Sequence, residues 1–219
     1  MKIKVNGVEL YYQKLGQGHP LMLIHGHHQD GAIFDKLVAP LSLYYTVYVP
    51  DMRGHGLSSG QPSEHYQTEV QDLAAFIRKL DLKRPYILGY GAGGVDALSL
   101  AYQYPNLIKK LIVAGTYVNG NGVSASHITL NSMRSILIGD RDSRVALKET
   151  YISPEKLKQI KIPTLCVVGE KDWVKVAHVR WYSEILPDSR LIIMPRQSHE
   201  SYVEHSLKLL DLIKEFCKD

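Results

Sequence analysis

A glycine-rich stretch near the middle of the chain, residues 89–94, constrains the fold more than any other feature of the sequence. It follows the apolar run 85–88, which predicts a strand, and it precedes residues 95–101, whose small and apolar side chains predict a helix. Glycine adopts positive φ angles without steric cost, so a strand can turn into a helix here within a few residues. A strand that leads directly into a helix is typical of α/β folds with a parallel sheet.

The same alternation of strand and helix runs through most of the chain. Short apolar runs predict strands at 21–24, 45–49, 85–90, 111–114, 163–168 and 190–194. Helical spacing of apolar residues predicts helices at 33–41, 68–80, 92–104, 174–186 and 201–217, with Leu207 among the inward residues of the last. An Asn6-Gly7 turn predicts an N-terminal hairpin. We expect an α/β fold with about eight mostly parallel strands and helices on both faces.

The alternation is lost between residues 117 and about 153, where glycines and serines are frequent. We interpret 117–155 as a short cap inserted into a single domain, 1–219. A short cap predicts a shallow and open site.

Composition narrows the class of protein. A chain of 219 residues is long enough for one domain with a sizeable core. Its 26 basic and 22 acidic residues give a net charge of +4 and form no basic stripe, so we expect no nucleic-acid partner. No apolar run reaches the roughly 18 residues that a membrane-spanning helix needs, and the N-terminus lacks a signal-peptide pattern. Cys166 and Cys217 fit reduced thiols in a cytoplasmic protein. The oligomeric state stays open.

Five short motifs lie at predicted strand ends. They are His25-Gly26, Asp51-x-Arg53-Gly54-His55-Gly56-x-Ser58, Gly89-x-Gly91-x-Gly93, Gly169-x-x-Asp172 and Ser198-His199. Their types and order resemble the α/β-hydrolase family, in particular its small esterase-like and C–C-hydrolase-like members. In that family the third motif is the nucleophile elbow, G-x-S-x-G, and in this chain Gly91 stands at the serine position.

The resemblance implies a role for several side chains. It implies that His199 is the base, that Asp172 orients it, and that the N–H groups of His27 and Ala92 form an oxyanion hole. The carboxyl ends of parallel strands meet at one edge of a sheet, so these loops can converge. The expected partner is a small-molecule substrate or ligand, and no cofactor is expected. The residues expected to line the substrate are His28, Tyr90, Tyr117, Met133, Ile136 and Leu137.

Each of these residues also has a structural interpretation. The alternative for Asp172 is a cap for a following helix, and for His199 it is an ordinary loop histidine. His55 is more often a structural hydrogen-bonding residue in its motif than a catalyst. The cluster of His25, His27 and His28 lacks a cysteine or acidic partner at metal-ligand spacing, so we expect no metal site. Asp96, in the helix after the elbow, is interpreted as complementing that helix's N-terminus.

Gly91 determines what chemistry is open to the chain. Acyl-enzyme chemistry needs a side-chain oxygen or sulfur at the elbow, and loss of the serine alone costs a triad enzyme about six decades in kcat. Three readings remain. The protein is a non-catalytic binding or interaction protein, a role resembling that of the N-Myc downstream-regulated family, which also has glycine there. In the second interpretation, the His199–Asp172 pair acts directly on water or substrate. Or Gly91 is an engineered replacement of a natural serine. For an enzyme, we expect a small ester, lactone or diketone-like substrate.

Overall fold

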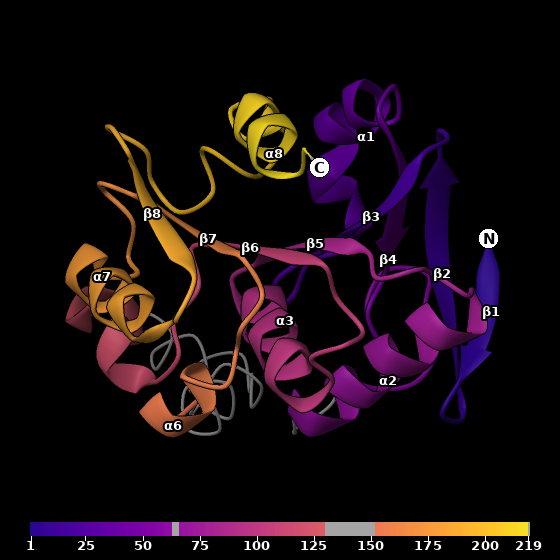
Figure 1. Cartoon of the computed structure of the whole chain (residues 1–219), viewed down its shortest axis with the longest axis horizontal. Coiled ribbons are helices and arrows are strands. Elements are labelled where there is room, and N and C mark those ends of the chain that lie inside the picture. The colour runs from indigo at the N-terminus through magenta and orange to yellow at the C-terminus, as the bar shows by residue number, and fades with distance from the viewer. Residues whose placement is uncertain (63–65, 130–151, 219) are drawn as a thin grey trace.

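The computed structural model of the chain describes residues 1–62, 66–129 and 152–218. These residues form an eight-stranded sheet with the order β1-β2-β4-β3-β5-β6-β7-β8 (Figure 1). The strands are β1 (Lys2–Val5), β2 (Val8–Leu15), β3 (His19–Ile24), β4 (Tyr45–Pro50), β5 (Tyr86–Tyr90), β6 (Lys110–Ala114), β7 (Thr164–Gly169) and β8 (Ser189–Met194). The sequence therefore predicted the fold class correctly.

Two pairings are antiparallel, β1 with β2 and β2 with β4, and the others are parallel. Strand β5 lies at the centre, where Gly89 pairs with Ile24 of β3 on one side and with Val113 of β6 on the other. The carboxyl ends of β3, β4, β5, β7 and β8 consequently lie at one edge of the sheet, and each is followed by one of the loops that carry the motifs.

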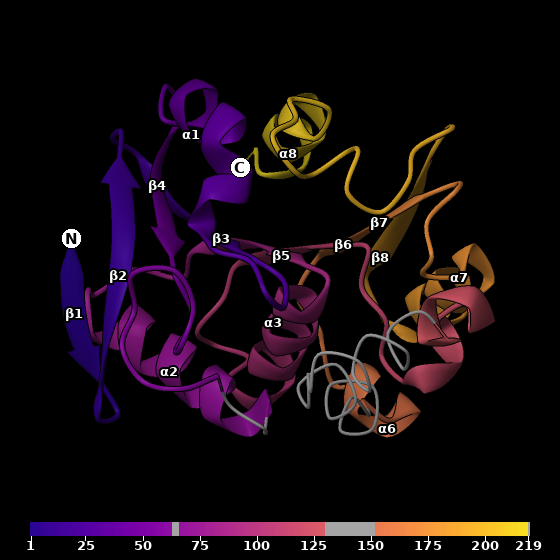
Figure 2. The same cartoon turned by 180° about the vertical axis from the view of Figure 1, so that it is seen from behind.

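Helices cover both faces of the sheet (Figures 1 and 2). One face carries α1 and α8, and the other carries α2, α3, α6 and α7. The helical segments are η1 (Gly31–Phe34), α1 (Asp35–Leu41), α2 (Tyr66–Lys79), α3 (Ala92–Gln103), η2 (Gly120–Gly122), α6 (Pro154–Leu157), α7 (Val176–Ile185) and α8 (Leu210–Phe216). Within the described ranges no helix is long and apolar enough to cross a membrane.

The two faces have separate apolar cores because successive side chains of a strand point to opposite sides. In β5, Ile87 packs into the core under α2 and α3. Its neighbours Tyr86 and Leu88 pack into the core under α1 and α8. Cys166 and Cys217 are both buried as free thiols, one in each core. The sheet is thus buried on both sides, which explains the continuous apolar runs in the sequence.

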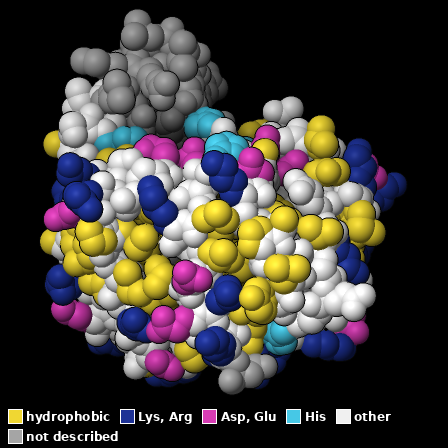
Figure 3. All heavy atoms as spheres, turned by 90° about the horizontal axis from the view of Figure 1, so that it is seen from above, with side chains coloured by type: hydrophobic (Ala, Val, Ile, Leu, Met, Phe, Trp, Pro, Cys, Tyr) yellow, Lys and Arg dark blue, Asp and Glu magenta, His cyan; other side chains and the backbone are white. Residues whose placement is uncertain are grey.

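The surface over α1 and α8 shows basic, acidic and apolar side chains interspersed (Figure 3). This face has no stripe of a single charge. The absence of a nucleic-acid partner and the cytoplasmic location stay predictions, as does the boundary of the cap, because residues 130–151 lie outside the described residues.

Three expected helix boundaries differ from the structure. The last helix is α8, which begins at Leu210 and not at 201, and Leu207 is 51% exposed instead of inward. Helix α7 begins at Val176 because Val174 instead pairs with Val123 in an isolated β-bridge. The 3-10 turn η1 takes up the first residues of the helix expected at 33–41.

Asp96 also differs from its interpretation. It does not complement a helix terminus but lies buried between α2 and α3, hydrogen-bonded to the buried Glu69. Oδ1 of Asp96 has no hydrogen-bond partner among the described residues. Burial raises the pKa of Glu69 to about 7, although the hydrogen bond from Asp96 acts in the opposite direction. Burial, followed by the charge of Glu69, raises the pKa of Asp96 well above its usual range. The pair therefore retains a proton at neutral pH.

We predict that this pair makes the folded protein more stable in mild acid. The folded chain keeps protons that the unfolded chain releases above about pH 4.5, so the free energy of unfolding falls as pH rises through 7. Glu69→Gln removes the part of this dependence that comes from Glu69, so its curve is less steep, and at pH 8 it adds up to about 3 kcal/mol relative to the parent. Thermal unfolding between pH 5 and 8 tests this. Glu215→Gln, at a side chain that is 62% exposed, is the control and should track the parent. Parallel pH curves for all three proteins would contradict the prediction.

Candidate active site

The turn between β5 and α3 places Gly91 at the carboxyl edge of the sheet. Gly91 has φ +53° and ψ −117°, a conformation that L-residues adopt only with strain, and its N–H donates to the carbonyl of Ala114 at 2.9 Å. A Cβ on Gly91 would meet His199 Nε2 at 3.6 Å and Gly26 Cα at 3.9 Å, which are ordinary contact distances, with no closer described neighbour. The backbone thus leaves room for a side chain next to the histidine.

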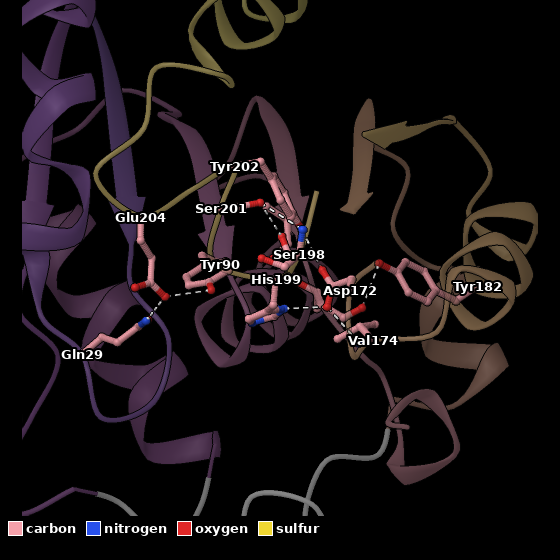
Figure 4. A network of polar contacts seen from close by, with 12 residues as sticks. Gln29, Tyr90, Asp172, Val174, Tyr182, Ser198, His199, Ser201, Tyr202 and Glu204 are labelled. Carbon is pink, nitrogen blue, oxygen red and sulfur yellow. Dashed lines mark hydrogen bonds and ion pairs between the residues drawn. The ribbon is translucent and has the colours of Figure 1, made fainter. Parts of the chain in front are cut away.

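His199 and Asp172 form a buried hydrogen-bonded pair (Figure 4). Nδ1 of His199 lies 2.8 Å from Oδ1 of Asp172, and the side chains are 7% and 0% exposed. A carboxylate on Nδ1 holds the neutral imidazole in the tautomer whose Nε2 is the proton acceptor. That Nε2 faces the space beside Gly91. The pair therefore has the geometry of a base and its orienting carboxylate.

Asp172 accepts two further hydrogen bonds. Its Oδ1 also accepts the N–H of Val174 at 2.8 Å, and its Oδ2 accepts the hydroxyl of Tyr202 at 3.1 Å (Figure 4). Burial, followed by the neighbouring charge of Asp172, raises the pKa of Tyr202 well above 10, so this hydroxyl stays protonated and donates. Three donors thus stabilise a charge that has no access to water.

Gly115, at the end of β6, leaves room for the histidine. It has φ +56°, and a Cβ there would lie 2.7 Å from Cε1 and 2.8 Å from Nδ1 of His199. Both distances are shorter than any normal carbon contact. Only glycine therefore fits beside His199 in its present orientation.

The loop after β3 is fixed by its own hydrogen bonds. Nδ1 of His25 pairs with the carbonyl of Gly26 at 2.7 Å, and Nε2 accepts the N–H of Met52 at 2.9 Å. Burial lowers the pKa of His25 to about 4, so it is neutral and structural. The N–H of Gly26 donates to Gln29 at 3.1 Å, so this group is committed inside the loop.

Gln29 continues this network toward the histidine. It donates to Glu204 at 2.6 Å, and the hydroxyl of Tyr90 donates to the same carboxylate at 3.0 Å (Figure 4). Tyr90 is 1% exposed, and its ring lies against the imidazole of His199 with a centroid distance of 4.8 Å. Tyr90 thus joins the loop after β3 to the loop after β8 and contacts the base.

The other expected site residues are distributed around the elbow. His27 is half-buried, with its ring 5.6 Å from that of His28, which is exposed, and 6.1 Å from that of His55. Ala92 is the first residue of α3. Their N–H groups as an oxyanion hole, and His28 as a lining residue, stay predictions. Tyr117 is buried, with its ring 5.9 Å from that of Trp173.

Three expected lining residues, Met133, Ile136 and Leu137, lie outside the described residues. Within the described part of the chain, no three histidine, cysteine or acidic residues are arranged to hold a metal ion.

The motif beginning at Asp51 is structural. The carboxylate of Asp51 accepts the N–H groups of Gly31 and Leu57 at 2.9 and 2.8 Å, and the hydroxyl of Ser58 donates to its carbonyl. His55 bonds through Nδ1 to the carbonyl of Arg53 at 2.9 Å, as expected for a structural hydrogen-bonding residue. These contacts shape the loop after β4, which packs beside the loop after β3.

Comparison with known proteins agrees with this geometry. The family model described as the alpha/beta hydrolase fold matches residues 19–140. The chain belongs to the α/β-hydrolase fold family. It is similar to the mouse serine hydrolase BPHL, with 25% identity over 251 residues that cover 99% of this chain and 86% of that protein. It is also similar to a pimeloyl-[acyl-carrier protein] methyl ester esterase of Vibrio parahaemolyticus, with 32% identity over 107 residues, 49% of this chain and 40% of that one.

Solved structures show the same α/β-hydrolase fold. A meta-cleavage product hydrolase from Pseudomonas fluorescens superposes with a TM-score of 0.84 at 20% identity, covering 99% of this chain and 96% of that one. The enol-lactonase from Burkholderia xenovorans superposes with a TM-score of 0.83 at 18% identity over the whole of both chains.

Sequence reasoning did not identify three residues that contact the base or its partner. Tyr202 lies three positions beyond His199, and its sequence context predicts only a place in the helix expected at 201–217. Gly115 directly follows a predicted strand, as the elbow glycine does, and that position was the available signal. Trp173 directly follows Asp172, so its proximity to the site was implied by the motif.

We predict that Gly115→Ala separates His199 from Asp172. Positive φ costs about 1 kcal/mol, and the added Cβ also displaces the imidazole. The downfield NMR resonance of the hydrogen-bonded Nδ1 proton should disappear. Gly7→Ala is the matched control, because Gly7 has φ +82° but no atom within 4 Å of the new Cβ. It should lose similar stability and keep the resonance. A resonance that survives in Gly115→Ala would show that the histidine tolerates the added methyl group.

Proposed function

We propose that the protein hydrolyses small esters, lactones or diketone-like compounds by using the His199–Asp172 pair to activate a water molecule. The observation that carries this proposal is the position of His199. Its Nδ1 is bound to Asp172 at 2.8 Å, and its Nε2 faces the space beside Gly91 that a serine side chain would fill. A water molecule in that space lies within reach of the base.

The proposed reaction needs no covalent intermediate. Nε2 of His199 takes a proton from the water while the oxygen attacks the substrate carbonyl carbon. The N–H groups of His27 and Ala92 are the proposed donors to the oxyanion that forms. The imidazolium, supported by Asp172, then gives its proton to the leaving group. Water is consumed, one C–O or C–C bond is broken and a carboxylic acid is formed.

The expected rates are modest. Without a nucleophile, a triad enzyme retains about 10³–10⁴-fold acceleration over water, from the oxyanion hole and binding. The names of the relatives support the substrate class, because they include a methyl ester esterase, an enol-lactonase and a meta-cleavage product hydrolase. The buried, three-donor environment of Asp172 also supports a catalytic pair, since ionised carboxylates are costly to bury.

Gly91 favours a second candidate, a binding protein without catalysis. Glycine accepts the strained elbow backbone without cost, which suits a chain that has kept the elbow for its shape alone. Under this alternative the site takes a small molecule and turns nothing over. The two candidates differ in whether activity depends on His199.

We predict that His199→Gln and Asp172→Asn each lower the rate of nitrophenyl acetate hydrolysis to the rate that free imidazole gives at the same concentration. Gln cannot accept the proton, and Asn no longer fixes the tautomer. The matched control is His205→Gln, because His205 bonds to Asp35 at 2.9 Å in a pair that is 55% exposed. It should hydrolyse at the parent rate. Equal rates in the parent and the three variants would contradict the proposed reaction and favour the binding-protein alternative.

We predict further that Gly91→Ser creates a serine hydrolase. The new hydroxyl would stand beside Nε2 of His199, so a fluorophosphonate should label it and esterase turnover should rise by about 10²-fold. Stability should fall by about 1 kcal/mol, because a non-glycine residue takes the positive φ. Gly91→Ala, with the same backbone strain and no hydroxyl, is the control. A folded Gly91→Ser protein that stays unlabelled would show that the surrounding groups do not support acyl transfer.

A further inference from the structure

We propose that Trp173 is a positioning residue for His199: its indole ring holds the imidazole toward Gly91 and favours the protonated imidazole over the neutral one. His127 stacks on the same indole, so a residue of the segment that follows η2 reaches the base through one side chain. This inference deepens the proposed function, because it concerns the base of that reaction. Its test reads the rings directly and needs no turnover.

The ring distances carry the inference. The centroids of Trp173 and His199 are 4.0 Å apart with an interplanar angle of 35°, and Tyr90 adds a second aromatic contact at 4.8 Å and 33°. His127 stacks on Trp173 at 3.9 Å with an angle of 6°. His199 is therefore in close contact with two aromatic rings, and one of those rings also supports a second histidine.

The backbone gives the indole little freedom to leave. The residue before it, Asp172, accepts the N–H of Val174, the residue after it, at 2.8 Å. The carbonyl of Trp173 accepts the N–H of Ser124 at 2.9 Å, and Val174 pairs with Val123. Hydrogen bonds thus fix the main chain on both sides of Trp173. The position of the Trp173 main chain beside His199 is therefore set by the fold.

A ring in this position should favour the charged imidazole. His199 is 6% exposed, so water cannot solvate the imidazolium that forms during proton transfer. An aromatic face attracts a cation, and the attraction grows when water is excluded. Trp173 and Tyr90 therefore supply, together with Asp172, part of the stabilisation that water would give. A leucine, which is smaller, would keep an apolar contact at this position without this electrostatic effect.

Other titratable groups surround His199 and define the controls. Asp172 follows β7, Tyr182 lies in α7 and Tyr90 lies in β5. Glu200, Tyr202 and Glu204 follow β8, and His127 is connected to His199 through Trp173. Burial raises the pKa of all three tyrosines above its usual value, so none of them changes charge between pH 5 and 9. Of this set, His127 is the other imidazole in contact with Trp173, so it must be separated from His199 in the test.

The first measurement uses Trp173 as its own reporter. The chain has two tryptophans, and Trp181→Phe leaves Trp173 as the only one. A protonated imidazole in contact with an indole quenches its fluorescence, so we expect emission to fall at least about twofold on acidification. The titration should persist in His127→Gln and disappear in His199→Gln, each in the Trp181→Phe background. A titration that follows His127 and ignores His199 would overturn the inference.

The second measurement reads His199 itself. Histidine-selective ¹⁵N NMR should show its titration midpoint lowered by about 0.5–1 pH unit in Trp173→Leu and by less in Trp173→Phe. The control is Trp181→Leu on α7, which should leave the midpoint unchanged. An unchanged midpoint in a folded Trp173→Leu protein would contradict the inference, because it would show that Trp173 contributes only packing. If Trp173→Leu does not fold, Trp173→Phe and the fluorescence titration replace it. If neither shows an effect that depends on His199, the inference is wrong. The proposed hydrolysis would not be affected by that result.

Discussion

The buried carboxylate of Asp172 is the group on which the arrangement of the candidate site depends. A side chain with 0% exposure cannot hold a charge without donors, and its three donors come from His199, Val174 and Tyr202. These contacts join the loop after β7 to the loop after β8. The same carboxylate fixes the imidazole so that Nε2 faces Gly91. Gly115 is needed because no larger residue leaves room for that imidazole.

Much of the fold could be predicted because its physical causes are local. Strands buried on both faces must be apolar throughout, so β3, β5, β6 and β7 are visible as runs in the sequence. The helix expected at 201–217 shows where local spacing is insufficient. Tyr202 and Val203 are buried, as a helix would predict, but Tyr202 is buried against Asp172 and His205 has φ +47°. The long-range hydrogen bond determines this segment, and helical periodicity does not detect it.

The site could be predicted in part for a similar reason. His199 and Asp172 were assigned by resemblance, and the structure brings them within 2.8 Å. The contacts of Trp173 and Tyr202 depend on how loops from separate strands meet, which no motif spacing encodes. Glu69, the partner of Asp96, lies on another helix, and only the packing of α2 on α3 identifies it. Local sequence patterns do not identify residues whose contacts are with residues distant in the sequence.

The space beside Gly91 has an evolutionary consequence. Glycine and serine codons can differ by a single base, so one point mutation separates this elbow from one with a hydroxyl. A Cβ at Gly91 meets its described neighbours only at ordinary contact distances, so the positive φ is the main cost of a side chain there, about 1 kcal/mol. The elbow residue could therefore change between glycine and serine without an earlier change elsewhere in the sequence.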